Sequence, residues 1–275
     1  MRRADRGFTV TAVRAAPAGP AVRRTHAGTD TGSPALLLVG HGSRDRRHAE
    51  TVRALTGRIR RSHPGLHVAA AFLDFDTPDV PGALEALRRD GAARAVAVPL
   101  LLTRAYHAKT DLPAVLADAP GPRVRQAAVL GGSPLLLAAV ERRLREAGLS
   151  AADRLTTGVV LAAAGSTDPE AIESVGAAAR ALRRSGWCAV RPAFVTGPRP
   201  RPAEVVRDLR ARGVRRVAVA PYVLAPGLLP DRIAAEAEAA RADVLSAPLG
   251  AAPEIARLVV RRAREAGLLT PAGSD

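Results

Sequence analysis

The sequence predicts an α/β protein of two tandem doubly wound domains with mainly parallel sheets, related by internal duplication. Two observations lead to this fold class. From Ala35 onward, short aliphatic runs alternate with amphipathic stretches, and the second half of the chain then repeats the first. Strands that alternate with helices are typical of a parallel sheet covered by helices on both faces. The length of 275 residues is sufficient for two domains of modest size.

The elements of the first half follow from hydrophobic spacing. Val52, Leu55 and Ile59 fall on one helical stripe, whereas continuous aliphatic runs such as ALLLVG are typical of buried strands. Gly91 ends a second helical stretch. The expected order is a strand at 35–40, a helix at 44–62, a strand at 67–75, a helix at 80–91 and a strand at 93–102.

The internal repeat divides the chain. LLLVGHGSRD matches VVLAAAGSTD, VAVPLLL matches VAVAPYVL, and LGGSPLLLAAVERRLREAGL matches LGAAPEIARLVVRRAREAGL. These matches predict domains at 35–149 and 157–269, joined by a linker at 150–156. Residues 1–34 lack hydrophobic periodicity and predict a disordered extension, and residues 270–275 predict a flexible tail.

Composition narrows the class of protein. Aromatic residues make up only 3%, so the cores must be aliphatic. No apolar run is long enough to cross a bilayer, so we expect a soluble protein without a membrane partner. Cys188 is the only cysteine, which excludes an intramolecular disulfide and disfavours a Cys-based zinc or iron–sulfur site. A cytoplasmic location fits this cysteine content.

The formal net charge of +15 comes almost entirely from arginine. A basic helix with interleaved aromatics and an RNA-binding aromatic motif are both missing from the sequence, so we do not expect nucleic acid as a partner. Two interpretations stay open: a solvated basic surface, and attraction for a small polyanion whose carboxylates bind guanidinium groups.

The candidate site lies beyond the carboxyl ends of the predicted strands, where parallel sheets bind their ligands. His41 and Ser43 follow the first strand, Asp74 follows the second, and the loop with His107 follows the third. Two histidines and a carboxylate are therefore expected on one rim. Arg104 and Lys109 belong to the same third loop.

The second half serves as a control within the same chain. It has Ala164 where the first half has His41, Thr196 where it has Asp74, and Leu229 near the position of His107. All six histidines of the chain lie at or before residue 107. We therefore expect the first domain to carry the chemistry, with one site per chain.

Three segments of the first half resemble a known family. LLLVGHGSRD, FLDFDTPDV and VAVPLLLTRAYHAKTDLP are similar to the class II chelatases of the sirohydrochlorin and cobalt chelatase type. The resemblance implies that His41 and His107 bind the incoming metal and assist removal of the pyrrolic protons. It also implies that Asp74 stands where a glutamate is usual.

The resemblance further implies the substrates. We expect insertion of Fe²⁺ into sirohydrochlorin, a tetrapyrrole rich in carboxylates, to give sirohaem, with Ser43, Arg44, Arg104 and Lys109 binding the substrate. The sequence has no Gly-Lys-Ser/Thr phosphate loop, so neither ATP nor an organic cofactor is expected.

Three alternatives stay open. The metal could be Co²⁺, on the route to cobalamin, or the chain could be a non-catalytic tetrapyrrole or metal carrier. A hydrolase using His41 and Ser43 is the least favoured, because their near-adjacent positions give no reason to expect a catalytic triad. The chain could act as a monomer or a homodimer.

Overall fold

The computed structural model describes residues 34–103 and 111–268. The predicted tail lies outside these residues, as does the predicted extension except for Pro34, the first residue of a strand. No helix in the described part of the chain has both the length and the apolar composition that a bilayer span requires.

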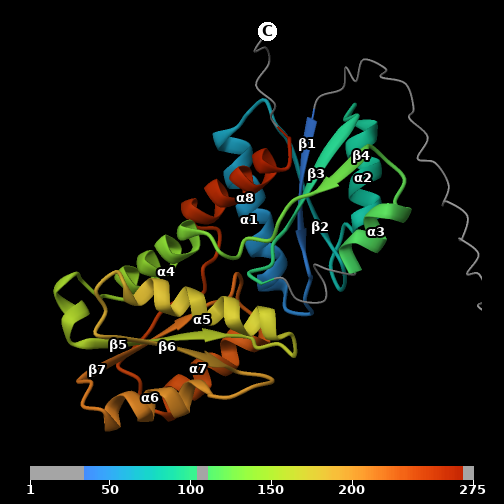
Figure 1. Ribbon diagram of the computed structural model, residues 1–275. Coiled ribbons are helices and arrows are strands. Elements are labelled where there is room, and N and C mark those ends of the chain that lie inside the picture. The colour runs from blue at the N-terminus through green and yellow to red at the C-terminus, as the bar shows by residue number, and fades with distance from the viewer. Residues whose placement is uncertain (1–33, 104–110, 269–275) are drawn as a thin grey trace, which may run out of the picture. The chain divides into compact units, whose positions relative to one another are not determined.

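The first half forms one parallel sheet in the order β2-β1-β3-β4 (Figure 1). Its strands are β1 (Pro34–Gly40), β2 (His67–Phe72), β3 (Arg94–Pro99) and β4 (Arg123–Gln126). Its helices are α1 (Arg46–Ser62), α2 (Val80–Arg89), α3 (Leu112–Asp118) and α4 (Pro134–Glu146).

The second half repeats this arrangement as a parallel sheet in the order β6-β5-β7-β8, after a short 3-10 helix, η2 (Ala152–Leu155). Its strands are β5 (Thr157–Ala163), β6 (Ala189–Phe194), β7 (Arg216–Pro221) and β8 (Val244–Leu245). Its helices are α5 (Pro169–Arg183), α6 (Pro202–Ala211), α7 (Leu228–Ala239) and α8 (Pro253–Glu265). The predicted fold class, two tandem α/β domains with parallel sheets, is confirmed. The exact domain boundaries stay a prediction.

The central strand β1 explains why the sequence forms a sheet covered on both faces. Leu36, Leu37 and Leu38 are all fully buried, although successive side chains of a strand point to opposite faces. Burial of one such side chain contributes about 1.5–3 kcal/mol. Helices must therefore cover both faces, as the alternation in the sequence predicts.

Helix α1 begins and packs as its sequence dictates. Asp45 is its N-cap, and the Asp45 carboxylate accepts a hydrogen bond of 3.0 Å from the backbone N of Arg47. The predicted stripe of Val52, Leu55 and Ile59 is buried. This packing fixes the position of the loop that precedes the helix.

The strands end earlier than the sequence suggests. β2 ends at Phe72 and β3 at Pro99, whereas strands were expected to residues 75 and 102. After Phe72 the chain turns at once, since Phe75 has a left-handed backbone with φ of +62°. The residues beyond the strand ends therefore form loops at the carboxyl edge of the sheet.

Two helices cover the sheet of the other repeat. α8 contacts β3 and α1, whereas α4 contacts β7 and α5 (Figure 1). One hydrophobic cluster accordingly contains Leu36 and Leu38 of the first sheet together with Val159 and Leu161 of the second. Both repeats belong to one compact unit.

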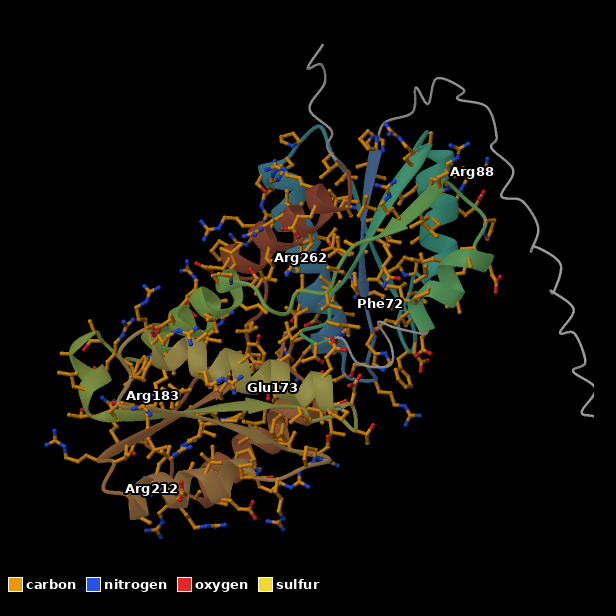
Figure 2. The ribbon with its side chains drawn as sticks, in the orientation of Figure 1. Phe72, Arg88, Glu173, Arg183, Arg212 and Arg262 are labelled. Carbon is orange, nitrogen blue, oxygen red and sulfur yellow. The ribbon has the colours of Figure 1, made fainter. Side chains whose placement is uncertain are left out.

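Polar contacts reinforce this exchange of helices. Arg142 of α4 donates two hydrogen bonds, of 2.8 and 2.6 Å, to the Glu254 carboxylate of α8. Arg262 lies on α8 (Figure 2). Its guanidinium donates to the backbone oxygens of Val129 and Gly131, at 2.9 and 2.8 Å. The last helix is thus bound to the first half by apolar and polar contacts.

Candidate active site

A cavity of about 1030 Å³ lies at the carboxyl ends of strands from both sheets. Its wall includes the loops that follow β1, β3, β5 and β7. Ligands of parallel sheets bind at the loops that follow the strands. The cavity therefore lies at the edge of the sheets where the sequence predicts the site.

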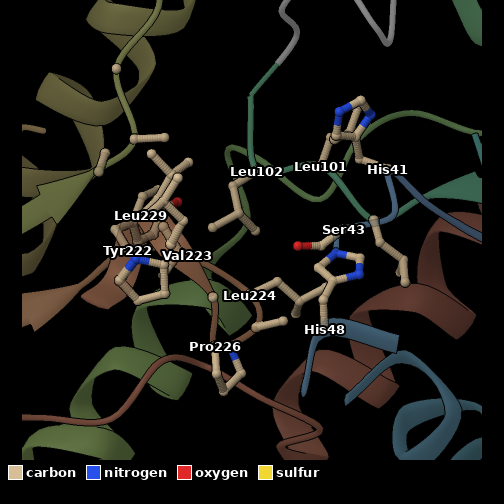
Figure 3. A pocket seen from close by; sticks show the side chains of 18 of the residues that line it. His41, Ser43, His48, Leu101, Leu102, Tyr222, Val223, Leu224, Pro226 and Leu229 are labelled. Atoms are coloured by element: carbon tan, nitrogen blue, oxygen red, sulfur yellow. The ribbon is translucent and has the colours of Figure 1, made fainter. Parts of the chain in front are cut away.

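The two sides of the cavity differ in polarity. The first half contributes His41, Ser43, Arg44 and His48 to the wall. The second half contributes mainly apolar side chains: Ala164, Ile172, Tyr222, Val223, Leu224, Pro226 and Leu229. Figure 3 shows the two histidines and Ser43 on one side and Tyr222, Val223 and Leu229 on the other. The cavity can therefore hold a ligand with both polar and apolar surfaces.

Backbone contacts fix His41 at the end of β1. The backbone N of Asp74 donates a hydrogen bond of 2.9 Å to the His41 oxygen. Gly42 follows with φ of +93°, and a Cβ there would lie 1.7 Å from the Asp74 oxygen. Only glycine permits this close approach of the two loops.

The second half has the same loop geometry. The backbone N of Thr196 donates to the Ala164 oxygen at 2.8 Å, and a Cβ on Gly165 would lie 2.0 Å from the Thr196 oxygen. Ala164 and Thr196 are thus the structural equivalents of His41 and Asp74, as the repeat predicts. The second half keeps the backbone of the loops without the imidazole and the carboxylate.

Ser43 links the two loops to the start of α1. Its backbone N donates to the Asp76 carboxylate at 3.0 Å, and its hydroxyl oxygen accepts from the Asp45 N at 3.1 Å. Hydrogen bonds from the Arg47 side chain and backbone lower the Asp45 pKa to about 2. Asp45 is therefore a carboxylate at neutral pH.

The structure brings together part of the predicted site. His41, Ser43 and Arg44 line one cavity. Asp74 is exposed, does not line the cavity, and its carboxylate accepts a hydrogen bond of 2.8 Å from the Phe75 N. Its link to His41 is through the backbone.

The remaining predicted residues, Arg104, His107 and Lys109, lie outside the described residues. Within 34–103 and 111–268, no three histidine, cysteine, aspartate or glutamate side chains cluster closely enough to hold a metal ion. The metal-binding role predicted for His41 and His107 therefore stays a prediction.

His48 lies at the cavity although it does not follow a strand. It lies in the first turn of α1 and lines the cavity, and its buried Nδ1 has no hydrogen-bond partner among the described residues. Burial lowers its pKa from the ordinary value, an effect to which nearby His41 adds. Alignment of the two repeats could have indicated His48, because the equivalent residue of the second half is Ala171, which also lines the cavity.

The sequence is similar to a known protein family and to enzymes with assigned reactions. A model of the CbiX family matches the chain twice, over residues 35–147 and 158–266. The chain is 29% identical over 241 residues to a sirohydrochlorin ferrochelatase of Bacillus subtilis, covering 84% of this chain and 91% of that protein. It is 26% identical over 205 residues to a sirohydrochlorin cobaltochelatase of Priestia megaterium, covering 72% of this chain and 66% of that protein.

A solved structure shows the same arrangement of domains. SirB from Bacillus subtilis with Fe³⁺ superposes with a TM-score of 0.74 and 29% identity, covering 86% of this chain and 96% of that chain. The resemblance seen in three sequence segments is therefore confirmed over both repeats. The chain belongs to the CbiX family.

Proposed function

We propose that this chain inserts a divalent metal ion, with Fe²⁺ favoured, into sirohydrochlorin. The observation that carries the proposal is the cavity of about 1030 Å³ with His41 in its wall, in a chain of the CbiX family. Small-molecule sites usually measure about 300–1,000 Å³, so this cavity has room for a substrate as large as a tetrapyrrole. The reaction uses neither ATP nor an organic cofactor.

Metal insertion exchanges two pyrrolic N–H protons for one divalent ion. Neutral imidazole binds iron and cobalt and accepts a proton near neutral pH. In the proposal, His41 and His107 first bind the ion, and as the ion passes to the pyrrole nitrogens the released imidazoles accept the two displaced protons. In this proposal Asp74 balances charge or orients a histidine, and its backbone N also donates the hydrogen bond that joins its loop to the His41 oxygen.

The polar and apolar sides of the cavity suit the two kinds of surface that the substrate has. Ser43 and Arg44 in the wall, together with Arg104 and Lys109, bind its peripheral carboxylates in this proposal. The apolar residues of the second half pack against the macrocycle. The second half thus contributes binding surface, and the first half contributes the reacting groups.

Cobalt is the second candidate metal, because one relative is a sirohydrochlorin cobaltochelatase. The same ligands suit both ions, and metal supply decides between them as much as ligand identity. A non-catalytic carrier is the other alternative, since it would use the same cavity without turnover.

We also propose that one chain holds one complete site, in a monomer or a homodimer, because both sides of the cavity come from the same chain. We further propose that the protein works in the cytoplasm, where its free Cys188 stays reduced.

The test is an anaerobic absorbance assay of the purified protein with sirohydrochlorin and either Fe²⁺ or Co²⁺. The variants His41→Ala and His107→Ala are measured beside it, with His67→Ala as a matched control because His67 does not line the cavity. Loss of a catalytic proton acceptor typically reduces the rate about 10²- to 10⁴-fold, and we expect losses of this size in the first two variants only.

Each outcome separates the candidates. Turnover with iron that both His41→Ala and His107→Ala lose supports the proposal, whereas faster turnover with cobalt assigns the chain to cobalamin synthesis. If neither metal is inserted faster than in a protein-free control, the enzyme proposal is wrong and the carrier alternative replaces it.

A further inference from the structure

Phe75 occupies a backbone position that suits glycine. Its φ of +62° is in the left-handed region, where a Cβ meets the neighbouring carbonyl oxygen. The equivalent residue of the second half, one position after Thr196, is Gly197 with φ of +66°. The turn therefore requires this backbone in both halves, and the first half carries a bulky side chain there at a steric cost.

Hydrogen bonds hold Phe75 in this conformation. Its backbone N donates to the Asp74 carboxylate at 2.8 Å, and the Asp76 N donates to the Asp74 oxygen at 2.7 Å. The Asp76 carboxylate in turn accepts from the Ser43 N at 3.0 Å. Three hydrogen bonds thus define the loop from which the side chain extends. Strained positions of this kind gather at binding and catalytic sites.

The ring of Phe75 lies among the candidate site residues. Its side chain lines the cavity and is 53% exposed, so it contributes little to the core. The ring meets the His41 imidazole edge-on, with 6.5 Å between ring centroids and 86° between planes. The guanidinium carbon of Arg44 lies 5.4 Å from the same ring centroid. At the positions of His41 and Arg44 the second half has Ala164 and Thr167, so all three groups of this contact are missing there.

We propose that Phe75 is a substrate-binding residue, against which the conjugated plane of the tetrapyrrole packs. Aromatic rings pack favourably in offset and edge-to-face geometries, and a large conjugated macrocycle offers both a face and an edge. Phe75 also holds the Arg44 guanidinium at the cavity, where it can bind a peripheral carboxylate of the same substrate. This inference rests on the proposed function.

The test replaces Phe75 with the residue that the second half uses. Phe75→Gly removes the ring and relieves the strained backbone, so the melting temperature should stay the same or rise. Affinity for metal-free sirohydrochlorin, followed by absorbance titration, should fall about tenfold, which is the range expected for loss of one aromatic contact. The KM should rise by a similar factor with little change in kcat, because the contact binds ground state and transition state alike.

Further variants distinguish loss of the Phe75 ring from a change in folding or in the flexibility of its loop. Phe75→Asn removes the ring but tolerates left-handed backbone and should show the same loss, whereas Phe75→Tyr should restore affinity. Leu155→Ala, which removes an exposed apolar side chain that does not line the cavity, is the matched control and should bind as the wild type does. Arg44→Gln should weaken binding less in the Phe75→Gly background than in the wild type.

Failure of this inference and failure of the proposed function differ in outcome. If the wild type inserts metal while Phe75→Gly and Phe75→Asn keep its affinity and KM, the role of Phe75 is wrong and the chelatase stands. If the wild type neither binds sirohydrochlorin nor inserts metal, the proposed function is wrong and the inference is overturned with it.

Discussion

The guanidinium of Arg47 on α1 binds the carboxylate of Asp231 on α7, with 2.6 Å between Nη2 and Oδ2. Arg47 also binds Asp45, the N-cap of its own helix. Because Asp45 and Asp231 both line the cavity, the ion pair joins the two repeats at the edge of the candidate site. Both partners are about half exposed, with 47% and 56% of their side-chain surface accessible.

This exposure predicts a weak, salt-sensitive interaction. In a double-mutant cycle of Arg47→Ala and Asp231→Ala, measured by urea unfolding, the coupling free energy should be small and should shrink between about 0.05 and 0.5 M salt. The same cycle on Arg46 and Glu50, an exposed pair within one helix, gives the coupling free energy of an ordinary surface ion pair for comparison. A coupling that does not change with salt would contradict the prediction.

Gly42 and Gly165 offer a matched pair of substitutions. A Cβ at either position would clash with a backbone oxygen, so Gly42→Ala and Gly165→Ala should each destabilise the fold by about 2 kcal/mol or more. Only the first should displace His41. Below both melting temperatures, Gly42→Ala should therefore lose at least about tenfold in kcat/KM for metal insertion, and Gly165→Ala far less. Equal losses of activity would show that the effect is general destabilisation.

His48 predicts a dependence of stability on pH. Burial lowers its pKa in the folded protein below the unfolded value of about 6.5. Above that value His48 is neutral in both states. As the pH falls through the window between the two pKa values, the unfolded state binds more protons and the free energy of unfolding decreases.

The variant His48→Leu should remove this part of the pH dependence. The change in packing does not depend on pH. Any pH dependence of the difference in unfolding free energy between variant and wild type is therefore due to titration of His48. Urea unfolding between about pH 8 and pH 5 should show a difference that changes only below about pH 6.5. A difference that is constant over this range would count against burial as the cause.

The fluorescence of Trp187 can be used to follow one polar contact between α4 and the second half. Its indole N–H donates to the Glu141 carboxylate at 2.9 Å, and Ser185 and Arg154 donate to the same carboxylate at 2.6 and 2.7 Å. Trp187 is the only tryptophan and is 3% exposed. Glu141→Ala removes the acceptor of these three hydrogen bonds, so the Trp187 N–H must bind water instead, and the loss should cost about 1.5–3 kcal/mol of stability.

The same variant should shift tryptophan fluorescence to longer wavelength, because water reaches the indole group. Glu173→Ala is the control, since the Glu173 side chain is 71% exposed and pairs with Arg180 on its own helix. Urea unfolding followed by fluorescence measures both effects. If the emission maximum of Glu141→Ala equals that of the wild type, packing alone excludes water from the indole.

The sequence predicts the sheets well because aliphatic runs and helical stripes report burial directly. The stripe of Val52, Leu55 and Ile59 is buried as expected. β4 and β8 were missed, since β4 is a four-residue strand with exposed arginines and β8 has only two residues. Hydrophobic spacing carries no signal for strands this short.

The repeat alone does not predict which sheet each helix covers. An amphipathic helix needs an apolar partner, and the sequences of α4 and α8 do not say which one. Their exchange follows from tertiary packing, which joins both repeats in one hydrophobic cluster.

The candidate site could be predicted in part. The rule that ligands bind at strand ends points to His41 and Ser43, and the structure places both, with Arg44 beside them, in the wall of one cavity. It misses His48, which comes to the cavity from a helix, and Phe75, whose role depends on a backbone angle that the sequence does not display. Comparison of the repeats marks both residues, since Ala171 and Gly197 replace them.

The exchange of α4 and α8 also sets an order for folding during synthesis. α8 is the last described helix to leave the ribosome, yet it covers part of the first sheet. The half of the chain that carries His41 therefore waits, with that face uncovered, until Glu265 has been made. Translation of the second repeat thus completes the packing of the first, and a chain that ended between the repeats would expose apolar surface of the kind that favours aggregation.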